Sequence, residues 1–304
     1  MRLLRRSPDL VIPYQFRRPP YGGSNQFLTA FRDELRRRGL RVSDGAFGRF
    51  TRACLLHSYL VDVDRLSGAI PDGCRVVHRV DGPIQLYRGT DDGADHEIVR
   101  INSSLADATV FQSRWSLEAH RELGIELRNP VVIHNAVDPS IFHPPLERSS
   151  GRRLRVIATS WSDNPRKGAA MVAALAQATD PARFEFTFIG RTQAPLDGVR
   201  QVEPLGSRSL AQELRMHDVY LAPSVNEPCS NALLEALSCG LPVLYRRSGS
   251  HAELVGAAGL GFEGDGDAAS QLERLAHDLD EHRGMIRAPR LAEVADQYIE
   301  VLGL

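Results

Sequence analysis

Lysine is almost absent from this chain. Of its 304 residues, 37 are lysine or arginine, and Lys167 is the only lysine, so the other 36 are arginines. Codon bias in a GC-rich genome accounts for the arginines but not for the position of the one lysine. The 38 acidic residues bring the net charge to −1, which excludes non-specific nucleic-acid binding through an overall positive field.

Paired cysteines and long apolar runs are also lacking. The four cysteines form no CxxC pair and no metal-ligand spacing, so we expect buried thiols in a cytoplasmic compartment and no bound metal. The N-terminal segment has no apolar run longer than four residues, too short for a signal peptide or a membrane-spanning helix. Arg2, Arg5 and Arg6 leave open a weak peripheral attachment to the inner face of a membrane.

The length and the residue pattern predict two domains. A hydrophobic fraction of 42% and a charged fraction of 25% are typical of globular proteins. Residues 143–153 combine proline, serine, glycine and charge without an apolar period, so we place the boundary there, between domains at 1–144 and 145–287. Strand-like and helix-like segments alternate in both halves, which predicts an α/β fold with parallel sheets covered by helices on both faces.

The expected elements follow apolar periodicity. The pattern predicts strands at 10–13, 55–63, 75–80, 108–112, 131–134, 154–158, 184–189, 219–222 and 242–245, and helices at 26–38, 96–105, 116–123, 169–178, 210–217 and 231–239. In such sheets ligands bind at the carboxyl ends of the strands, so the turns that follow these strands are the candidate sites.

The turn at residues 160–168 is the first candidate. It leaves a strand, contains Arg166 and Lys167, and opens a helix whose free N–H groups and dipole favour an anion. It lacks the GxxxxGK[ST] pattern, so ATP-type phosphoryl transfer has no support. The turn therefore predicts either a phosphate site or a helix start with two solvated cations.

A second candidate contains two glutamates eight positions apart. Glu227 lies in the loop after an apolar strand, and Glu235 lies about one turn into the helix that follows. Between them, residues 229–231 expose backbone amides that favour an anion. A carboxylate that accepts from two adjacent hydroxyls is a usual way to bind a sugar edge. The alternative is a solvated loop glutamate and an exposed helix residue.

Two weaker candidates lie in the first half. Gly22 and Gly23 stand at the start of the first long helix, where paired glycines allow a close backbone approach to a ligand or simply form a turn. The strand VVHRVDGP places His78, Arg79 and Asp81 near its carboxyl end, and Asp81 is the nearest of the three. His78 could equally be a half-buried, hydrogen-bonded residue.

Taken together, these residues resemble the retaining glycosyltransferases of sequence family four, called glycosyl transferases group 1. The segment EPCSNALLEALSCGLPV, from Glu227 to Val243, looks like that family's two glutamates separated by seven residues, with the helix and strand that follow. Shorter matches in the family's order are YGG at 21–23, RKG at 166–168, FIG at 188–190 and DVYLAPS at 218–224. The resemblance implies the GT-B architecture, in which two Rossmann-like, doubly wound parallel-sheet domains face a central cleft. It also implies that a last helix, at about 288–304, packs back on the N-terminal, acceptor-side domain.

The resemblance implies a role for each candidate in the second domain. Lys167 would contact the donor diphosphate, Glu227 the transferred sugar and Glu235 the ribose. The amides of Ser230 and Asn231 would lie near the sugar or the distal phosphate.

The resemblance also implies roles for the first-half candidates. Gly22 and Gly23 would contact the donor diphosphate with Lys167, and Asp81 or His78 would face the C6 side of the transferred sugar. The family's usual arginine, five or six residues before its lysine, is replaced here by the Ser-Trp-Ser of residues 160–162. The sequence leaves open whether Arg166 replaces it.

The function implied by the resemblance is sugar transfer, with retention of configuration, from a nucleotide-diphosphate sugar to a hydroxyl of a small-molecule, glycan or lipid-linked acceptor. No metal and no other cofactor are expected. Two alternatives stay open: a non-catalytic nucleotide-sugar-binding protein, since that arginine is missing and the first half is short, and a sugar-nucleotide 2-epimerase, which can share the fold.

Overall fold

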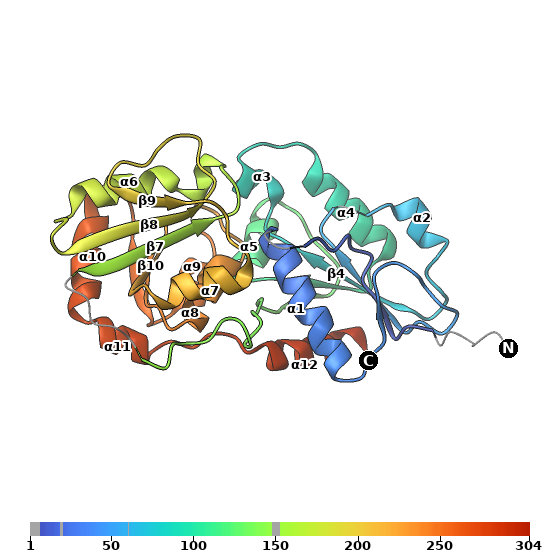
Figure 1. Cartoon of the computed structure of the whole chain (residues 1–304). Coiled ribbons are helices and arrows are strands. Elements are labelled where there is room, and N and C mark those ends of the chain that lie inside the picture. The colour runs from blue at the N-terminus through green and yellow to red at the C-terminus, as the bar shows by residue number, and fades with distance from the viewer. Residues whose placement is uncertain (1–6, 19–20, 60, 148–152) are drawn as a thin grey trace. The chain divides into compact units, whose positions relative to one another are not determined.

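The computed structural model describes residues 7–18, 21–59, 61–147 and 153–304, so Arg2, Arg5, Arg6 and residues 148–152 of the predicted linker lie outside the described residues. The chain divides into two units (Figure 1). The first unit comprises Met1–Arg17, Leu28–Asn135 and Leu291–Leu304, and the second comprises Arg18–Phe27 and Ala136–Arg290. The boundary expected at 144/145 therefore falls within the second unit, which also takes the glycine loop at 21–23.

The first unit is built on a six-stranded parallel sheet in the order β2-β1-β3-β4-β5-β6. Its strands are β1 (Leu10–Val11), β2 (Val42–Ser43), β3 (Ala53–His57), β4 (Arg75–Val80), β5 (Ala108–Phe111) and β6 (Pro130–Val132). All five residues of β3 are buried, which is typical of a parallel strand covered on both faces.

One strand expected in this unit is wrong in its second half. The strand predicted at 55–63 ends at His57, and Val63 instead opens a short helix. The Asp62 side chain accepts a hydrogen bond from the backbone N–H of Arg65 at 3.1 Å, so it caps this helix. The apolar residues of 55–63 favoured a single long strand, so the sequence analysis did not recognise Asp62 as a helix cap.

Six helices accompany the first sheet: α1 (Gly23–Arg37), α2 (Val63–Ser67), α3 (Ile84–Arg88), α4 (Ala94–Leu105), α5 (Arg114–Glu122) and α12 (Leu291–Leu302). Helix α1 begins in the segment assigned to the second unit and continues in the first. Helix α12 packs within the first unit, where the rings of Phe31 and Tyr298 have centroids 4.7 Å apart. The Arg75 side chain also donates to the Val301 carbonyl at 2.6 Å.

The second unit has its own six-stranded parallel sheet, in the order β12-β11-β10-β7-β8-β9. Its strands are β7 (Leu154–Ser160), β8 (Phe184–Gly190), β9 (Val199–Val202), β10 (Val219–Ala222), β11 (Val243–Arg246) and β12 (Gly259–Phe262). Its helices are the 3-10 turn η1 (Pro165–Lys167), α6 (Ala169–Ala178), α7 (Ser207–Arg215), α8 (Asn231–Ser238), α9 (His251–Val255), α10 (Asp265–His277) and α11 (Leu279–Gly284).

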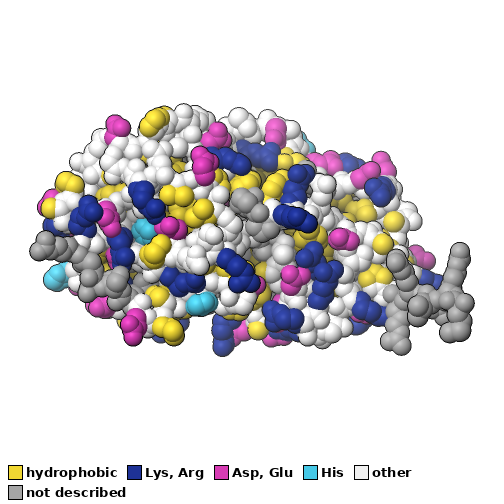
Figure 2. All heavy atoms as spheres, in the orientation of Figure 1, with side chains coloured by type: hydrophobic (Ala, Val, Ile, Leu, Met, Phe, Trp, Pro, Cys, Tyr) yellow, Lys and Arg dark blue, Asp and Glu magenta, His cyan; other side chains and the backbone are white. Residues whose placement is uncertain are grey.

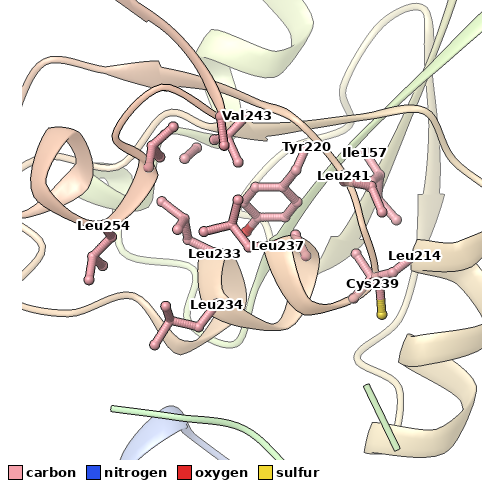
Figure 3. Close-up of a cluster of buried hydrophobic side chains, with 14 of the residues drawn as sticks. Ile157, Leu214, Tyr220, Leu233, Leu234, Leu237, Cys239, Leu241, Val243 and Leu254 are labelled. Carbon is pink, nitrogen blue, oxygen red and sulfur yellow. The ribbon is translucent and has the colours of Figure 1, made fainter. Parts of the chain in front are cut away.

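Two apolar clusters cover the two faces of this second sheet. Alternate residues of the strands point to opposite faces, so Val219 and Leu221 pack with α6 and α10, whereas Tyr220 packs with α7, α8 and α9. Figure 3 shows Leu233 and Leu237 of α8 beside the Tyr220 ring. Both sheets are thus doubly wound, as expected, and the central β7 and β10 end where the candidate site begins.

The surface carries no dominant charge in the view of Figure 2, where side chains of both signs are interspersed. Among the described residues, no helix is long and apolar enough to cross a membrane.

Candidate functional site

Lys167 lies in a tight turn directly after the central strand β7. The Asn164 side chain accepts from the backbone N–H of Arg166 at 2.9 Å, which starts the turn η1. Gly168 ends it at φ +78°, and a Cβ there would lie 2.7 Å from the carbonyl oxygen of Pro223, at the end of β10. Only glycine fits this approach, so the turn holds Lys167 against the neighbouring strand end.

Lys167 and Glu227 form an ion pair. The lysine Nζ donates to Glu227 Oε2 at 2.6 Å, and the two side chains are 30% and 15% exposed. The loop after β11 fixes the glutamate backbone, because the Glu227 carbonyl accepts from the Ser250 amide at 2.9 Å and from the Ser250 hydroxyl at 3.0 Å. Gly249, at φ +63°, lets that loop approach: a Cβ there would lie 2.4 Å from Glu227 N.

Helix α8 starts beside this pair. The Ser230 hydroxyl caps the helix by accepting from the Leu233 amide at 3.2 Å. Asn231 is the first helical residue, and its Oδ1 is buried without a hydrogen-bond partner among the described residues. The helix start therefore presents an anion-favouring dipole next to an ammonium and a carboxylate.

The glycine loop lies against the start of α8, within the second unit. A Cβ on Gly23 would lie 2.5 Å from Asn231 Nδ2, so no larger residue fits without moving that amide. Gly22 is less crowded, since a Cβ there would lie 3.6 Å from Trp161. The structure thus brings together Lys167, Glu227, Asn231 and the paired glycines.

Glu235 lies on the buried face of α8, with 6% of its surface exposed. Burial raises the pKa of its carboxyl from 4.5 to about 8, so the group is mostly protonated at neutral pH. Glu235 is therefore not an exposed helix residue, which was the alternative left open by the sequence, and its carboxyl is mostly uncharged in the free protein.

Arg166 contributes no side-chain ion pair among the described residues. Trp161, which replaces the family's usual arginine, instead holds a different cation: the Arg191 guanidinium lies 4.2 Å from the centre of its ring. Arg191 follows β8, and its Nη1 also approaches the Trp161 carbonyl at 3.5 Å. Sequence reasoning missed this arginine, and the Gly-Arg at the end of a strand is the only local signal for it.

Asp81 lies at the end of β4 in the first unit, and its side chain is 16% exposed. Burial by itself raises the pKa of its carboxyl, but His57, Arg79 and a hydrogen bond from Gln112 outweigh burial and hold that pKa below its usual value. Asp81 is therefore a carboxylate at neutral pH.

His78 does not fit the predicted contact with a ligand. Its side chain is fully buried, its Nε2 lies 2.8 Å from the Ser58 carbonyl and its Nδ1 lies 3.4 Å from Asn102 Nδ2. Strand β4 is paired on both sides and buried on both faces, so His78 in its middle is buried, whereas Asp81 lies just beyond the strand end. Of the two residues offered for this contact, only Asp81 has an accessible side chain.

The described residues contain no group of three or more histidine, cysteine, aspartate and glutamate side chains arranged to hold a metal ion. The four cysteines are all buried, as expected.

Comparison with known proteins was made on sequence and on structure. Residues 155–278 match the family model described as glycosyl transferases group 1. A search of curated protein sequences gives no match.

Several solved structures share the whole fold. Sucrose-phosphate synthase from Thermosynechococcus elongatus aligns with a TM-score of 0.70 and 15% identity over 98% of this chain and 95% of that one. HepE from Anabaena, in complex with UDP-glucose, aligns with a TM-score of 0.67 and 15% identity over 97% and 96%. AviGT4, a glycosyltransferase involved in avilamycin A biosynthesis, aligns with a TM-score of 0.67 and 18% identity over 97% and 96%.

These matches agree with the geometry. The family model covers β7 to α10, the segment that holds Lys167, Glu227 and Glu235. Residues 155–278 thus match the model of the glycosyl transferases group 1 family, and along its length the chain has the two-sheet GT-B fold of the glycosyltransferases that it resembles.

Proposed function

We propose that the protein is a retaining glycosyltransferase that moves a sugar from a nucleotide-diphosphate sugar to an acceptor hydroxyl. The observation that carries the proposal is the ion pair of Lys167 and Glu227 beside the start of α8 and the paired glycines. This arrangement offers an ammonium and helix amides to a diphosphate, and a carboxylate to sugar hydroxyls. The match to UDP-glucose-bound HepE supports the donor class.

In this proposal Lys167 acts mainly on the leaving group. The bond between the anomeric carbon and the diphosphate oxygen breaks, and negative charge develops on the diphosphate. Lys167, the first amides of α8 and the Gly22–Gly23 amides stabilise that charge, and one such donor contributes about 2.7 to 4 kcal/mol. Glu227 leaves the lysine on donor binding and accepts from hydroxyls of the sugar.

The acceptor oxygen then bonds to the anomeric carbon from the face that the diphosphate leaves, and the acceptor proton passes to the departing phosphate. In the described part of the second unit Glu227 is paired with Lys167 and not with a second carboxylate, which favours this front-face route over a double displacement. Neither a metal nor another cofactor takes part in the proposed reaction. Buried thiols at all four cysteines support a cytoplasmic location.

Glu235 would bind the donor ribose. Because its carboxyl is protonated at neutral pH, one of its oxygens donates to a hydroxyl and the other accepts, instead of both accepting.

The test begins with the ligand. A thermal-shift screen of nucleotides and nucleotide sugars should raise the melting temperature with a nucleotide diphosphate, because a bound ligand stabilises the folded state by RT ln(1 + [L]/Kd). The protein is then incubated with that donor alone and with a panel of alcohols and glycans.

Transfer to an acceptor with the α or β configuration of the donor unchanged is the expected result. Isomerised donor without acceptor would instead identify an epimerase, and tight donor binding with no turnover on any acceptor would identify a binding protein. Lys167→Ala should lower turnover by about two orders of magnitude. Arg274→Ala, which changes an exposed arginine of α10 in the same unit, is the matched control.

A further inference from the structure

A fully buried arginine lies at the end of β4, one strand away from solvent-accessible His57. Arg79 has none of its surface exposed, although arginine is among the residues least often buried. Such a charge is stable only when it is surrounded by acceptors. Its neighbours therefore show what the charge does.

A closed ring of side chains surrounds the guanidinium. Arg79 Nη2 donates to Asn135 Oδ1 at 2.8 Å, and Asn135 Nδ2 donates to Gln112 Oε1 at 2.8 Å. Gln112 in turn donates to the Asp81 carboxylate, whose Oδ1 lies 3.9 Å from Arg79 Nη1. All four side chains belong to the first unit and come from β4, the turns after β4 and β5, and the segment after β6.

Arg79 also determines which nitrogen of His57 carries a proton. Its Nη1 lies 2.9 Å from His57 Nδ1, and a guanidinium has only donors, so Nδ1 must accept. Burial and the neighbouring Arg79 lower the pKa of His57 to about 4, although Asp81 opposes the shift. At neutral pH the imidazole is therefore neutral, with its one proton on Nε2.

That Nε2–H has no acceptor among the described residues. The His57 side chain is 7% exposed, and its Nε2 is not among the buried side-chain atoms that lack a partner, so this nitrogen reaches solvent. His57 ends β3 next to the end of β4. The Tyr14 ring lies beside it, with centroids 5.8 Å apart. A solvent-reaching N–H that no protein group accepts from is available to a ligand or to water.

We propose that His57 Nε2–H donates to one hydroxyl group of a polyhydroxylated substrate, that the Asp81 carboxylate accepts from hydroxyls of that substrate at the same edge of the sheet, and that Arg79 is the positioning residue that makes His57 a donor. Arg79 Nη1 lies 2.9 Å from His57 Nδ1 and 3.9 Å from Asp81 Oδ1, so one guanidinium anchors both side chains. The assignment of that hydroxyl to a sugar substrate rests on the proposed function.

Arg79 also separates the two polar groups. Without Arg79, the Asp81 carboxylate would raise the pKa of His57 and favour its protonated form. His57 and Asp81 would then form an ion pair with each other instead of offering a neutral donor and an acceptor to a ligand. The buried charge thus keeps the two groups free for a ligand.

The first test needs no activity. Long-range proton–nitrogen NMR spectra of the imidazole side chains report which nitrogen is protonated, and His57→Asn identifies the His57 signals. We expect a neutral Nε2–H form from pH 6 to 8. Glucose, mannose and UDP-glucose are then added separately, and at least one should shift the His57 Nε2–H signal. A charged ring, an Nδ1–H form, or no shift with any of the three sugars would overturn the proposal.

The second test separates Arg79 as a positioning residue from Arg79 as a structural one. Arg79→Lys keeps a donor toward Nδ1 and should retain the Nε2–H signature, whereas Arg79→Met should lose it and give a protonated ring below about pH 6.5. Retention of the signature in a folded Arg79→Met protein would refute the role. If Arg79→Met does not fold, loss of the signature in folded Arg79→Lys would refute it instead.

Kinetics distinguish the source of the hydroxyl. In His57→Asn the amide oxygen still accepts from Arg79 near the Nδ1 position, but the distal donor is lost, so kcat/KM for transfer should fall about tenfold. If donor hydrolysis in the absence of acceptor falls equally, the hydroxyl belongs to the transferred sugar; if hydrolysis is unchanged, it belongs to the acceptor.

The matched control is His217→Asn. It changes a buried histidine of the second unit whose two ring nitrogens contact Glu213 and Thr187, and it should leave kcat/KM for transfer unchanged. An unchanged rate of transfer in His57→Asn would contradict the proposal. Wild-type protein that transfers no sugar would refute the proposed function, while the NMR titration would still decide whether the hydroxyl site exists.

Discussion

Replacement of Glu235 by glutamine should change how the stability of the second unit depends on pH. Burial raises the pKa of this carboxyl from 4.5 in the unfolded chain to about 8 in the folded one. Below pH 4.5 both states hold the proton, and pH has no effect through this group. Between pH 4.5 and 8 the unfolded chain releases the proton and the folded one keeps it, so the free energy of unfolding falls as pH rises.

The size of this effect follows from the two pKa values. Each pKa unit corresponds to about 1.36 kcal/mol, so the wild type loses about 3 kcal/mol by pH 7 and approaches about 5 kcal/mol above pH 8. Glutamine has the same shape and does not titrate. Relative to the wild type, Glu235→Gln should therefore gain stability steadily between pH 5 and pH 8, by roughly 3 kcal/mol.

The assay is urea unfolding of both proteins at pH 5, 6, 7, 8 and 9. The chain has two tryptophans, Trp115 in the first unit and Trp161 in the second, so a Trp115→Phe background makes the fluorescence report the second unit. Glu203→Gln, at an exposed position of the same unit, is the control and should show no such trend. A constant difference between Glu235→Gln and its parent from pH 5 to 9 would refute the buried, protonated carboxyl.

The remaining predictions concern the candidate site. Lys167→Arg keeps the charge but not the compact ammonium, so we expect lost turnover with retained donor binding by calorimetry, and full turnover would contradict the assigned role. Glu235→Gln should raise KM for the donor more than it lowers kcat, because a ribose contact is largely uniform binding; an effect on kcat alone in steady-state kinetics would argue against a ribose contact. Gly23→Ala should destabilise the second unit by about 1 to 3 kcal/mol in urea unfolding, since the new methyl group meets Asn231, while Gly22→Ala should be nearly neutral. Equal effects of the two alanines would show that Asn231 moves aside freely.

Much of the second unit was predictable, because its signals are local. The helix predicted at 169–178 is observed with the same bounds, and the helix predicted at 231–239 is observed as Asn231–Ser238. Apolar periodicity and the Ser230 cap depend on neighbours within one turn of the chain. In the first unit the apolar run at 10–13 indicates β1 (Leu10–Val11), whereas β2 (Val42–Ser43) has only two residues and no apolar period, so it was not predicted.

The choice between His78 and its neighbours shows where sequence reasoning ends. The strand VVHRVDGP drew attention to His78, yet the structure buries it against Ser58 and leaves His57, 21 positions earlier, beside Asp81. Arg79 was one of the three polar candidates of that strand but not the favoured one, because its partners His57 and Asn135 lie in other segments, 22 and 56 positions away. Only the parallel pairing of β3, β4 and β5 brings those segments to one edge of the sheet.

The sequence by itself determined the alternation of strands and helices, the match of residues 155–278 to a glycosyltransferase family model, and the position of the one lysine in an anion-favouring turn. These properties depend on residues close together in the chain. The tertiary structure alone decided that Glu235 is protonated, that Lys167 pairs with Glu227, and that a buried arginine sets the proton on His57. Each of these depends on desolvation or on charge–charge distances between distant segments, and neither quantity exists until the chain has folded.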